Sequence, residues 1–223
     1  EFRRVLFRSK PRVSYRETVL SEANDVRGLF KKQTGGRGQF GDAVISVSQI
    51  TEAEAEEQEL KYKDGVVFVD KISGGVIPRE YIPSVEYGVR QAAMSGVLGG
   101  YPLINIKVEL VFGSYHDADS SQVAFEQAGS LAFREAVTKA GPALLEPIMK
   151  LSVTTPDEYF GTVSGDIASR RGHIVDSDLR GVVRIITAEV PLSEMFGYTT
   201  TLRSMTQGRA TSSMEPAEYR VMP

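Results

Sequence analysis

Cysteine is absent from all 223 residues of the chain. Its absence excludes disulfide bonds, thiolate nucleophiles, zinc-finger sites and iron–sulfur ligation, and it fits a reducing compartment. The chain also lacks an apolar run of the roughly 20 residues that cross a bilayer, and no secretory signal pattern opens it. We therefore expect a cytoplasmic protein that does not associate with membranes.

Histidine is nearly absent, since His116 and His173 are the only two in the sequence. Two isolated histidines make no metal-ligand spacing, so the sequence predicts no metal site. The glycine-rich segment 35–41 (GGRGQFG) lacks the Lys-Ser/Thr ending with which a P-loop reaches a terminal phosphate and magnesium. We therefore expect no nucleotide cofactor and no enzymatic activity in this stretch of chain.

The formal net charge of −3 hides an uneven distribution of charge along the chain. Residues 1–40 hold ten lysines and arginines against four acids, whereas five glutamates lie between positions 52 and 59. The balance argues against a protein that coats nucleic acid nonspecifically. It predicts instead that one end of the first domain meets phosphate while another face stays solvated.

Hydrophobic periodicity indicates an α+β fold in the first part of the chain. Strand patterns lie at 26–32, 43–47, 66–69 and 103–112, and the acidic run at 52–59 fits either a polar hairpin extension or a short exposed helix. Helix patterns lie at 82–95 and after Asp119, which we expect to be an N-cap. The second helix carries a small-residue face and ends near Gly141; its face is formed by Ala124, Ala128, Leu131, Ala132 and Ala136.

An internal repeat organises the last 80 residues. The motif EYFG at 158–161 recurs as EMFG at 194–197, and a further glycine follows each motif eleven residues later, at Gly172 and Gly208. Each copy is read as a strand, a helix and a second strand, with a capping box starting at Thr155 before the first helix. The doubled strand–helix–strand pattern predicts a ferredoxin-like split βαβ domain.

Three groups of residues are candidates for function. The loop at 33–41 carries Lys31, Lys32 and Arg37 beside its glycines, which fits either contact with RNA phosphates or a wide hairpin. His116 lies near Asp117 and several serines, the residue types of a hydrolase triad. Ser120 and Ser121 are nevertheless better explained as the start of a helix. Cations recur near the ends of the two repeated helices, where they either complement the helix dipole or contact RNA; they are Arg170, Arg171, Arg203 and Arg209.

Five motifs together resemble elongation factor G, a translational GTPase: QTGGRGQFG at 33–41, GGVIPREYIP at 74–83, GSYHDADSS at 113–121, LEPIM at 145–149 and EMFGY at 194–198. The resemblance covers nearly everything after Lys10. It implies that residues 11–141 are the family's fourth domain, an elongated α+β module with a ribosomal-protein-like fold. Residues 142–223 are then its fifth, ferredoxin-like domain, and residues 1–10 are a non-native or linker segment. The GTPase domain, with its GTP and magnesium, is absent.

The resemblance also implies a role in translation. In the family the fourth domain mimics the anticodon arm of tRNA and places two tip loops in the decoding A site during translocation. The partners expected on this basis are the ribosome, through rRNA of both subunits, the A-site and P-site tRNAs and mRNA, and we expect a monomer. By motif match the tip loops are 35–41 and 114–119, with Gln39 and His116 near tRNA and mRNA. The fifth domain is expected near the base of the large-subunit stalk.

The candidate ribosome-binding residues are Lys32, Gln33, Gly35, Gly36, Arg37, Gly38, Gln39, Ser114, Tyr115, His116, Asp117, Arg170, Arg171 and Arg209. Two alternatives stay open at this point. One is a ribosome-recycling or ribosomal-protection paralogue with the same domain plan. The other, more remote, is a small Ser/His hydrolase built around His116, which lacks the strained Gly-x-Ser-x-Gly turn of many such enzymes.

Overall fold

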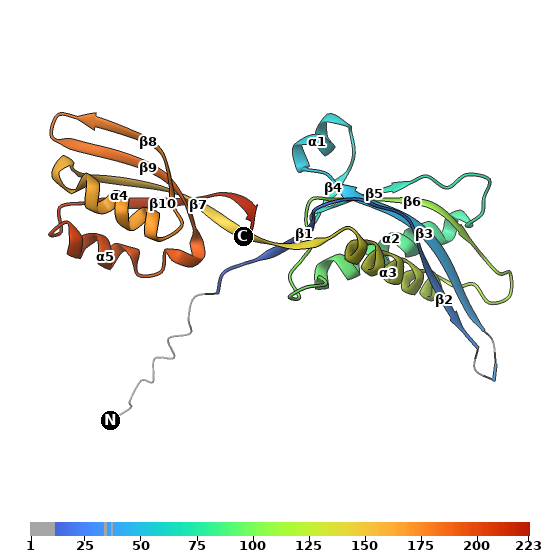
Figure 1. Ribbon diagram of the computed structural model, residues 1–223. Coiled ribbons are helices and arrows are strands. Elements are labelled where there is room, and N and C mark those ends of the chain that lie inside the picture. The colour runs from blue at the N-terminus through green and yellow to red at the C-terminus, as the bar shows by residue number, and fades with distance from the viewer. Residues whose placement is uncertain (1–11, 34, 37) are drawn as a thin grey trace, which may run out of the picture. The chain divides into compact units, whose positions relative to one another are not determined.

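The computed structural model describes residues 12–33, 35–36 and 38–223, which form two compact units (Figure 1). The first unit is Arg16–Leu144. The second unit is Leu145–Pro223 together with residues 12–15. Each unit has its own hydrophobic core, and the two are described separately.

A five-stranded sheet forms the first unit, in the order β2-β3-β6-β5-β4. Its strands are β2 (Ala23–Lys32), β3 (Gln39–Gln49), β4 (Tyr62–Lys63), β5 (Val66–Asp70) and β6 (Ile106–Ser114). Neighbouring strands are antiparallel except for β5 and β6, which run parallel. Helices α2 (Ile82–Ser95) and α3 (Gln122–Lys139) cover one face of the sheet (Figure 1). The strands and helices predicted from periodicity are therefore present.

Small residues bring helix α3 unusually close to strands β2 and β3. A Cβ atom added at Gly28 would lie 2.2 Å from the carbonyl oxygen of Ala128, and one added at Gly41 would lie 2.3 Å from that of Ala124. The predicted small-residue face is thus confirmed, with one exception. Leu131 is 45% exposed, because the buried arc continues on its other side through Phe133 and Val137.

The start of α3 differs from the sequence prediction. The N-cap is Ser121, whose hydroxyl accepts the backbone N–H of Ala124 at 3.2 Å, and not Asp119. Asp119 is held by the sheet instead, since its carbonyl oxygen accepts the N–H of Phe40 at 2.8 Å. Its carbonyl oxygen therefore pairs with β3 in place of a helical N–H group, and α3 starts later in the chain, at Gln122.

The acidic run after β3 forms a short helix. Helix α1 (Glu52–Glu57) begins at a capping box in which the hydroxyl of Thr51 and the carboxylate of Glu54 bond to each other's backbone N–H. It packs on a small cluster that contains Ile50, Ala55 and Val67. Of the two structures that the sequence allowed for this run, the helix is the one adopted.

The second unit has the predicted doubled strand–helix–strand plan. Its strands are β7 (Pro142–Pro156), β8 (His173–Arg180), β9 (Val183–Pro191) and β10 (Thr211–Val221), and they pair antiparallel in the order β10-β7-β9-β8. Helices α4 (Phe160–Ser169) and α5 (Tyr198–Met205) lie over one face (Figure 1). Strand β1 (Arg16–Val19) also pairs with β7, whose first residues belong to the first unit. The two βαβ halves confirm the ferredoxin-like prediction.

The capping box expected before α4 is absent. Thr155 is buried, and its hydroxyl bonds to the carbonyl oxygen of Pro156. A 3-10 turn over Asp157–Tyr159 leads into α4 instead, and a matching turn over Leu192–Glu194 comes before α5. The structure therefore preserves the repeat even where the local capping differs from the prediction.

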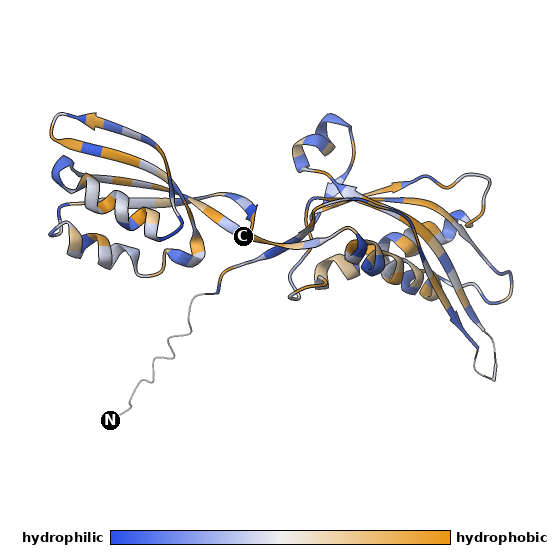
Figure 2. Cartoon of the chain, viewed as in Figure 1, coloured by the Kyte–Doolittle hydropathy of each residue, from blue (hydrophilic) through white to orange (hydrophobic). Residues whose placement is uncertain are grey.

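Opposite faces of the second sheet have opposite character. Leu151, Val153, Ile186 and Ala188 are buried under the two helices. Along β7 and β9 these apolar residues alternate with polar ones, as the hydropathy colouring shows (Figure 2). No helix in the described part of either unit is long and apolar enough to cross a membrane.

Candidate nucleic-acid interface

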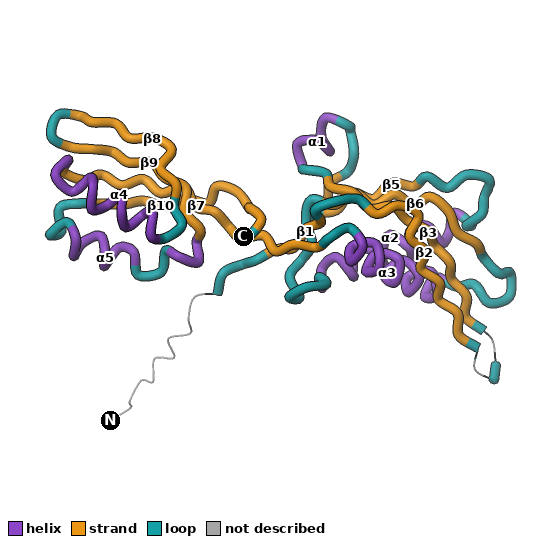
Figure 3. Tube along the Cα trace, in the orientation of Figure 1, coloured by secondary structure: helices purple, strands orange, loops and turns teal. Residues whose placement is uncertain are grey.

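Two loops of the first unit meet at one end of its sheet. The first loop joins β2 to β3, and the second follows β6 and leads into α3 (Figure 3). Besides the bond from Phe40 N–H to the Asp119 carbonyl, Phe40 and Ser120 form an isolated β-bridge. The rings of Phe40 and His116 lie with their centroids 6.3 Å apart. We call this pair of loops the tip. Arg37, a predicted site residue, lies outside the described residues.

A hollow of about 250 Å³ lies between the two loops. Its polar lining consists of Lys31, Lys32, Gln33, Gln39, His116 and Asp119. Gly38 completes the wall, where an added Cβ would lie 2.8 to 2.9 Å from the Asp119 carboxyl group. Only a residue without a side chain fits there unless Asp119 moves. The structure thus brings Gln39 and His116, which are far apart in sequence, to one site.

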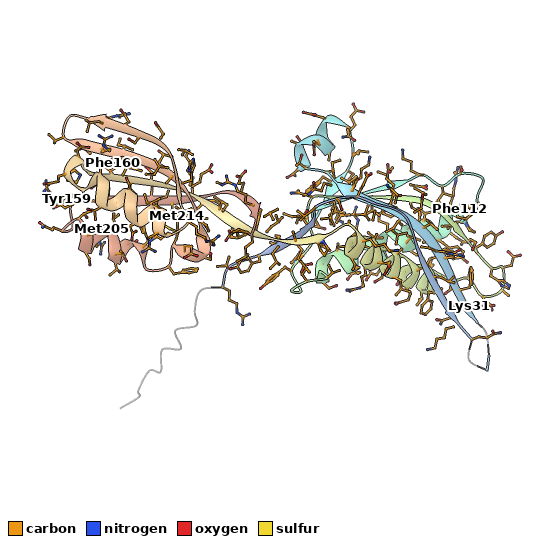
Figure 4. The ribbon with its side chains drawn as sticks, viewed as in Figure 1. Lys31, Phe112, Tyr159, Phe160, Met205 and Met214 are labelled. Carbon is orange, nitrogen blue, oxygen red and sulfur yellow. The ribbon has the colours of Figure 1, made fainter. Side chains whose placement is uncertain are left out.

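Most predicted residues of the tip are open to solvent. The exposed residues are Lys31, Lys32, Gln33, Gly35, Gly36, Gln39, Tyr115, His116 and Asp117. Gly38 and Ser114 are half-buried. Among the described residues neither lysine has an ion-pair partner, so their positive charges face solvent. Lys31 lies at the end of β2 beside the first loop (Figure 4).

The second loop is ordered by its own serines. The hydroxyl of Ser120 accepts the backbone N–H of His116 at 2.9 Å, and the N–H of Ser120 donates to the His116 carbonyl oxygen at 2.9 Å. The His116 imidazole is 61% exposed and lies 3.7 Å from the Asp119 carboxylate. The hydroxyls of Ser120 and Ser121 each accept a backbone N–H group, which supports the explanation of these serines as residues that order the start of α3.

A buried carboxylate lies directly beneath the tip. Asp42 accepts two hydrogen bonds from the guanidinium of Arg27, at 2.7 and 2.8 Å, and one from the hydroxyl of Ser114 at 2.5 Å. The hydrogen bond from Arg27 to Asp42 raises the pKa of Arg27 above its ordinary value. Sequence reasoning missed Asp42; its only signal was a charged residue directly before the strand predicted at 43–47.

Arg171, a candidate in the second unit, is committed to its own fold. It donates to both carboxylate oxygens of Glu146, at 2.8 and 3.0 Å, and to Glu194 at 3.2 Å. Glu146 is buried, and its hydrogen bond to Arg171 raises the pKa of the arginine well above its ordinary range. This residue therefore links the first part of β7 to the turn before α5.

Arg170 and Arg209 are engaged in a similar way. Arg170 donates to the Asp166 carboxylate at 2.9 Å and to the Glu194 carbonyl oxygen at 2.6 Å. Arg209 pairs with Glu158, and its guanidinium lies 5.7 Å from the ring centre of Tyr159, which Figure 4 labels. These arginines bind neighbouring elements of the second unit, a role that neither of the sequence hypotheses included.

Over its described residues, neither unit shows a side-chain cluster suited to a metal ion. Among the described residues, no group of three or more histidines and acids is arranged to hold one. His173, the second histidine, is exposed at the first position of β8. The chemistry that this interface offers is hydrogen bonding and positive charge.

Comparisons with known proteins agree with this architecture. A family model described as elongation factor G, domain IV, matches residues 11–141, and one described as elongation factor G C-terminus matches residues 143–223. A protein of Thermus thermophilus with a known crystal structure is 39% identical, with a TM-score of 0.81. The match covers 96% of this chain and 30% of that protein, so this chain spans less than a third of its length. The chain belongs to the elongation factor G family and is a translation-factor segment that carries its domain IV and C-terminal domain.

Proposed function

We propose that this segment promotes translocation of tRNA and mRNA by placing its tip in the decoding A site of the small ribosomal subunit. One observation carries the proposal: two loops, bordered by the exposed Lys31 and Lys32, are fixed to each other through Phe40 and Asp119 and present exposed polar side chains. A rigid element of this kind needs no catalysed reaction to act. It binds the site that a shifted tRNA vacates, and its preference for the shifted state opposes return.

The chemistry of the tip suits RNA. Glycines at 35, 36 and 38 permit close approach of the backbone to a ribose–phosphate chain. Lys31 and Lys32 supply positive charge for phosphates, while Gln39 and His116 offer hydrogen bonds to ribose and base edges. The second unit, by family resemblance, is proposed to bind rRNA of the large subunit.

No reaction is assigned to this segment, and we propose that it neither binds nor hydrolyses GTP. The glycine-rich loop ends in Gln39-Phe40 where a P-loop has Lys-Ser/Thr. Titration of the 223-residue chain with GTP and magnesium by calorimetry is expected to show no saturable heat. Saturable binding in the micromolar range would refute this part of the proposal.

The experiment that tests the tip uses a complete factor that carries this segment. His116→Ala and Gln39→Ala should each slow mRNA movement about ten-fold, because each removes one or two hydrogen bonds of roughly 1 to 1.5 kcal/mol made in the shifted state. Phosphate release from GTP should stay near its normal rate. A matched variant, Glu56→Ala on the exposed face of α1, should leave both rates unchanged.

Two rapid-kinetic assays on the same variants decide the question, one following mRNA and the other phosphate. Slowing of movement alone supports the tip as the element that acts on tRNA and mRNA. Equal slowing of both rates, or slowing of GTP hydrolysis alone, contradicts the proposal.

A further inference from the structure

We propose that Asp42 is a positioning residue for the tip: its buried carboxylate fixes where the second loop, and therefore His116, lies relative to Gln39. The positioning itself is a property of this chain. Its consequence for ribosome binding rests on the function proposed above.

Asp42 joins three strands beneath the two loops. It lies on β3 opposite Ser114 of β6, and its carboxylate receives the guanidinium of Arg27 from β2. The side chain is about 2% exposed, whereas that of Arg27 is 58% exposed. The carboxylate is thus enclosed by its own partners. Asp42 follows Gln39 by three residues, and Ser114 precedes His116 by two residues.

The second loop is anchored to β3 near both of its ends. Ser114, the last residue of β6, bonds to Asp42 at the start of the loop. Asp119 accepts the N–H of Phe40 near the end of the loop. Since Gln39 is the first residue of β3, one strand carries Gln39 and both anchors of the loop that presents His116. The anchor at Asp42 is the one made by side chains, and substitution can remove it without altering the backbone.

The same contacts argue for a role in geometry more than in stability. A desolvated ion pair contributes little net stability, because the loss of hydration offsets the attraction between the charges. It does impose directional bonds, and an unpaired partner left behind is unfavourable. Loss of the Ser114 hydroxyl leaves Arg27 in place on the carboxylate and leaves the strand pairing of β3 with β6 intact, so the fold is retained while the loop loses its side-chain anchor.

NMR of the 223-residue chain tests the positioning directly. The Phe40 and His116 rings, 6.3 Å apart between centroids, should give cross-relaxation between ring protons. Ser114→Ala and Asp42→Asn should weaken or remove this signal and shift the His116 ring resonances. Ser114→Thr, which keeps the hydroxyl, should restore both. Ser48→Ala, a half-buried serine elsewhere on β3, is the matched control and should change neither.

Binding to isolated small ribosomal subunits tests the consequence. Ser114→Ala should bind about three- to ten-fold more weakly than the unaltered chain, as expected for roughly one misplaced hydrogen-bonding group, with a melting temperature close to that of Ser48→Ala. If the ring signal and the His116 resonances persist in Ser114→Ala, the positioning role is wrong, whatever the affinity. If the unaltered chain itself fails to bind the subunit, the proposed function fails, and the NMR result still decides the role of Asp42.

Discussion

Basic residues at the tip and basic residues of the second unit look alike in the sequence but differ in the structure. Lys31 and Lys32 project from the end of β2 with no ion-pair partner among the described residues. Arg171 and Arg209 are held by acids of their own unit. A cation available to RNA and a cation that stabilises a fold are therefore distinguished by their partners.

The difference matters for binding because nucleic-acid affinity depends on charge that can replace counterions. An arginine that already neutralises a buried carboxylate must break that bond before it can meet a phosphate. We infer that RNA contact by the first unit draws on free charge, whereas contact by the second unit must use other groups or share its arginines. Three sets of substitutions can break this comparison.

The largest effect is expected at Arg171. Arg171→Ala leaves the Glu146 carboxylate, 3% exposed, without its bidentate partner. Breaking a buried pair costs several kcal/mol, but Arg171 is 37% exposed and screened by solvent, so we expect the unfolding free energy to fall by about 2 kcal/mol.

Urea denaturation of the chain is the measurement, with Arg209→Ala as the control. Arg209 and Glu158 are both more than half exposed, so that variant should change stability by less than about 0.5 kcal/mol. Equal stability of the two variants would show that pairing with a buried acid stabilises the second unit no more than pairing with an exposed one.

A smaller effect is expected at Glu17, a buried acid that is satisfied by backbone groups in place of an arginine. Burial raises its pKa, but the N–H groups of the 97–101 loop outweigh burial and hold the pKa below the ordinary 4.5. These donors are Val97, Leu98, Gly99 and Tyr101, at 2.7 to 3.2 Å. The stabilisation is therefore present above pH 4.5 and lost as the pH falls through the lowered value.

Glu17→Gln should lower the stability of the first unit by roughly 1 to 2 kcal/mol at neutral pH, because an amide offers one acceptor oxygen and brings two donors. The difference in stability between Glu17→Gln and the unaltered chain should become smaller in acid, where the carboxylate of the unaltered chain is protonated. Thermal melts from about pH 7 to about pH 2 give the measurement, and Glu22→Gln, at an exposed position, is the control. A deficit that stays constant with pH would show that the charge of Glu17 is not what the loop requires.

The smallest effect in free energy is expected at the tip lysines. Replacement of Lys31 and Lys32 by alanine should weaken small-subunit binding about five-fold, near 1 kcal/mol, without changing stability. The slope of log affinity against log salt should also fall, by roughly 0.7 to 0.9 for each phosphate that is no longer neutralised. The paired control replaces Lys61 and Lys63, which are exposed elsewhere in the same unit. Equal weakening in both double variants would indicate a general charge effect instead of a site.

Sequence periodicity predicted the elements of both units because periodicity records which side of a strand or helix is buried. Helix starts were less predictable. The carbonyl oxygen of Asp119, the predicted N-cap, accepts the N–H of Phe40, and Ser121 is the N-cap instead. Capping preferences are local, and the contact that overrides them comes from a residue 79 positions earlier in the chain.

The pairing of acidic with basic side chains could not be predicted from the sequence. Arg171 reaches Glu146 across 25 positions and Glu194 across 23. Asp42 reaches Arg27 across 15 positions and Ser114 across 72. A motif match brought His116 and Gln39 to notice, but no pattern in one sequence shows which acid neutralises which base. Only the register of β2, β3 and β6 reveals the carboxylate beneath the tip.

The central claim, that the tip meets the decoding region of the small subunit, is tested most directly by cleavage of rRNA from a tethered iron chelate. Because the chain has no cysteine, Ala118→Cys in the second loop and Glu56→Cys on α1 each give a single attachment point. Bound to small subunits, the chain labelled at position 118 should cut rRNA around the decoding site, and the chain labelled at position 56 should not. Equal cutting from both positions, or decoding-site cuts from position 56 alone, would contradict the account.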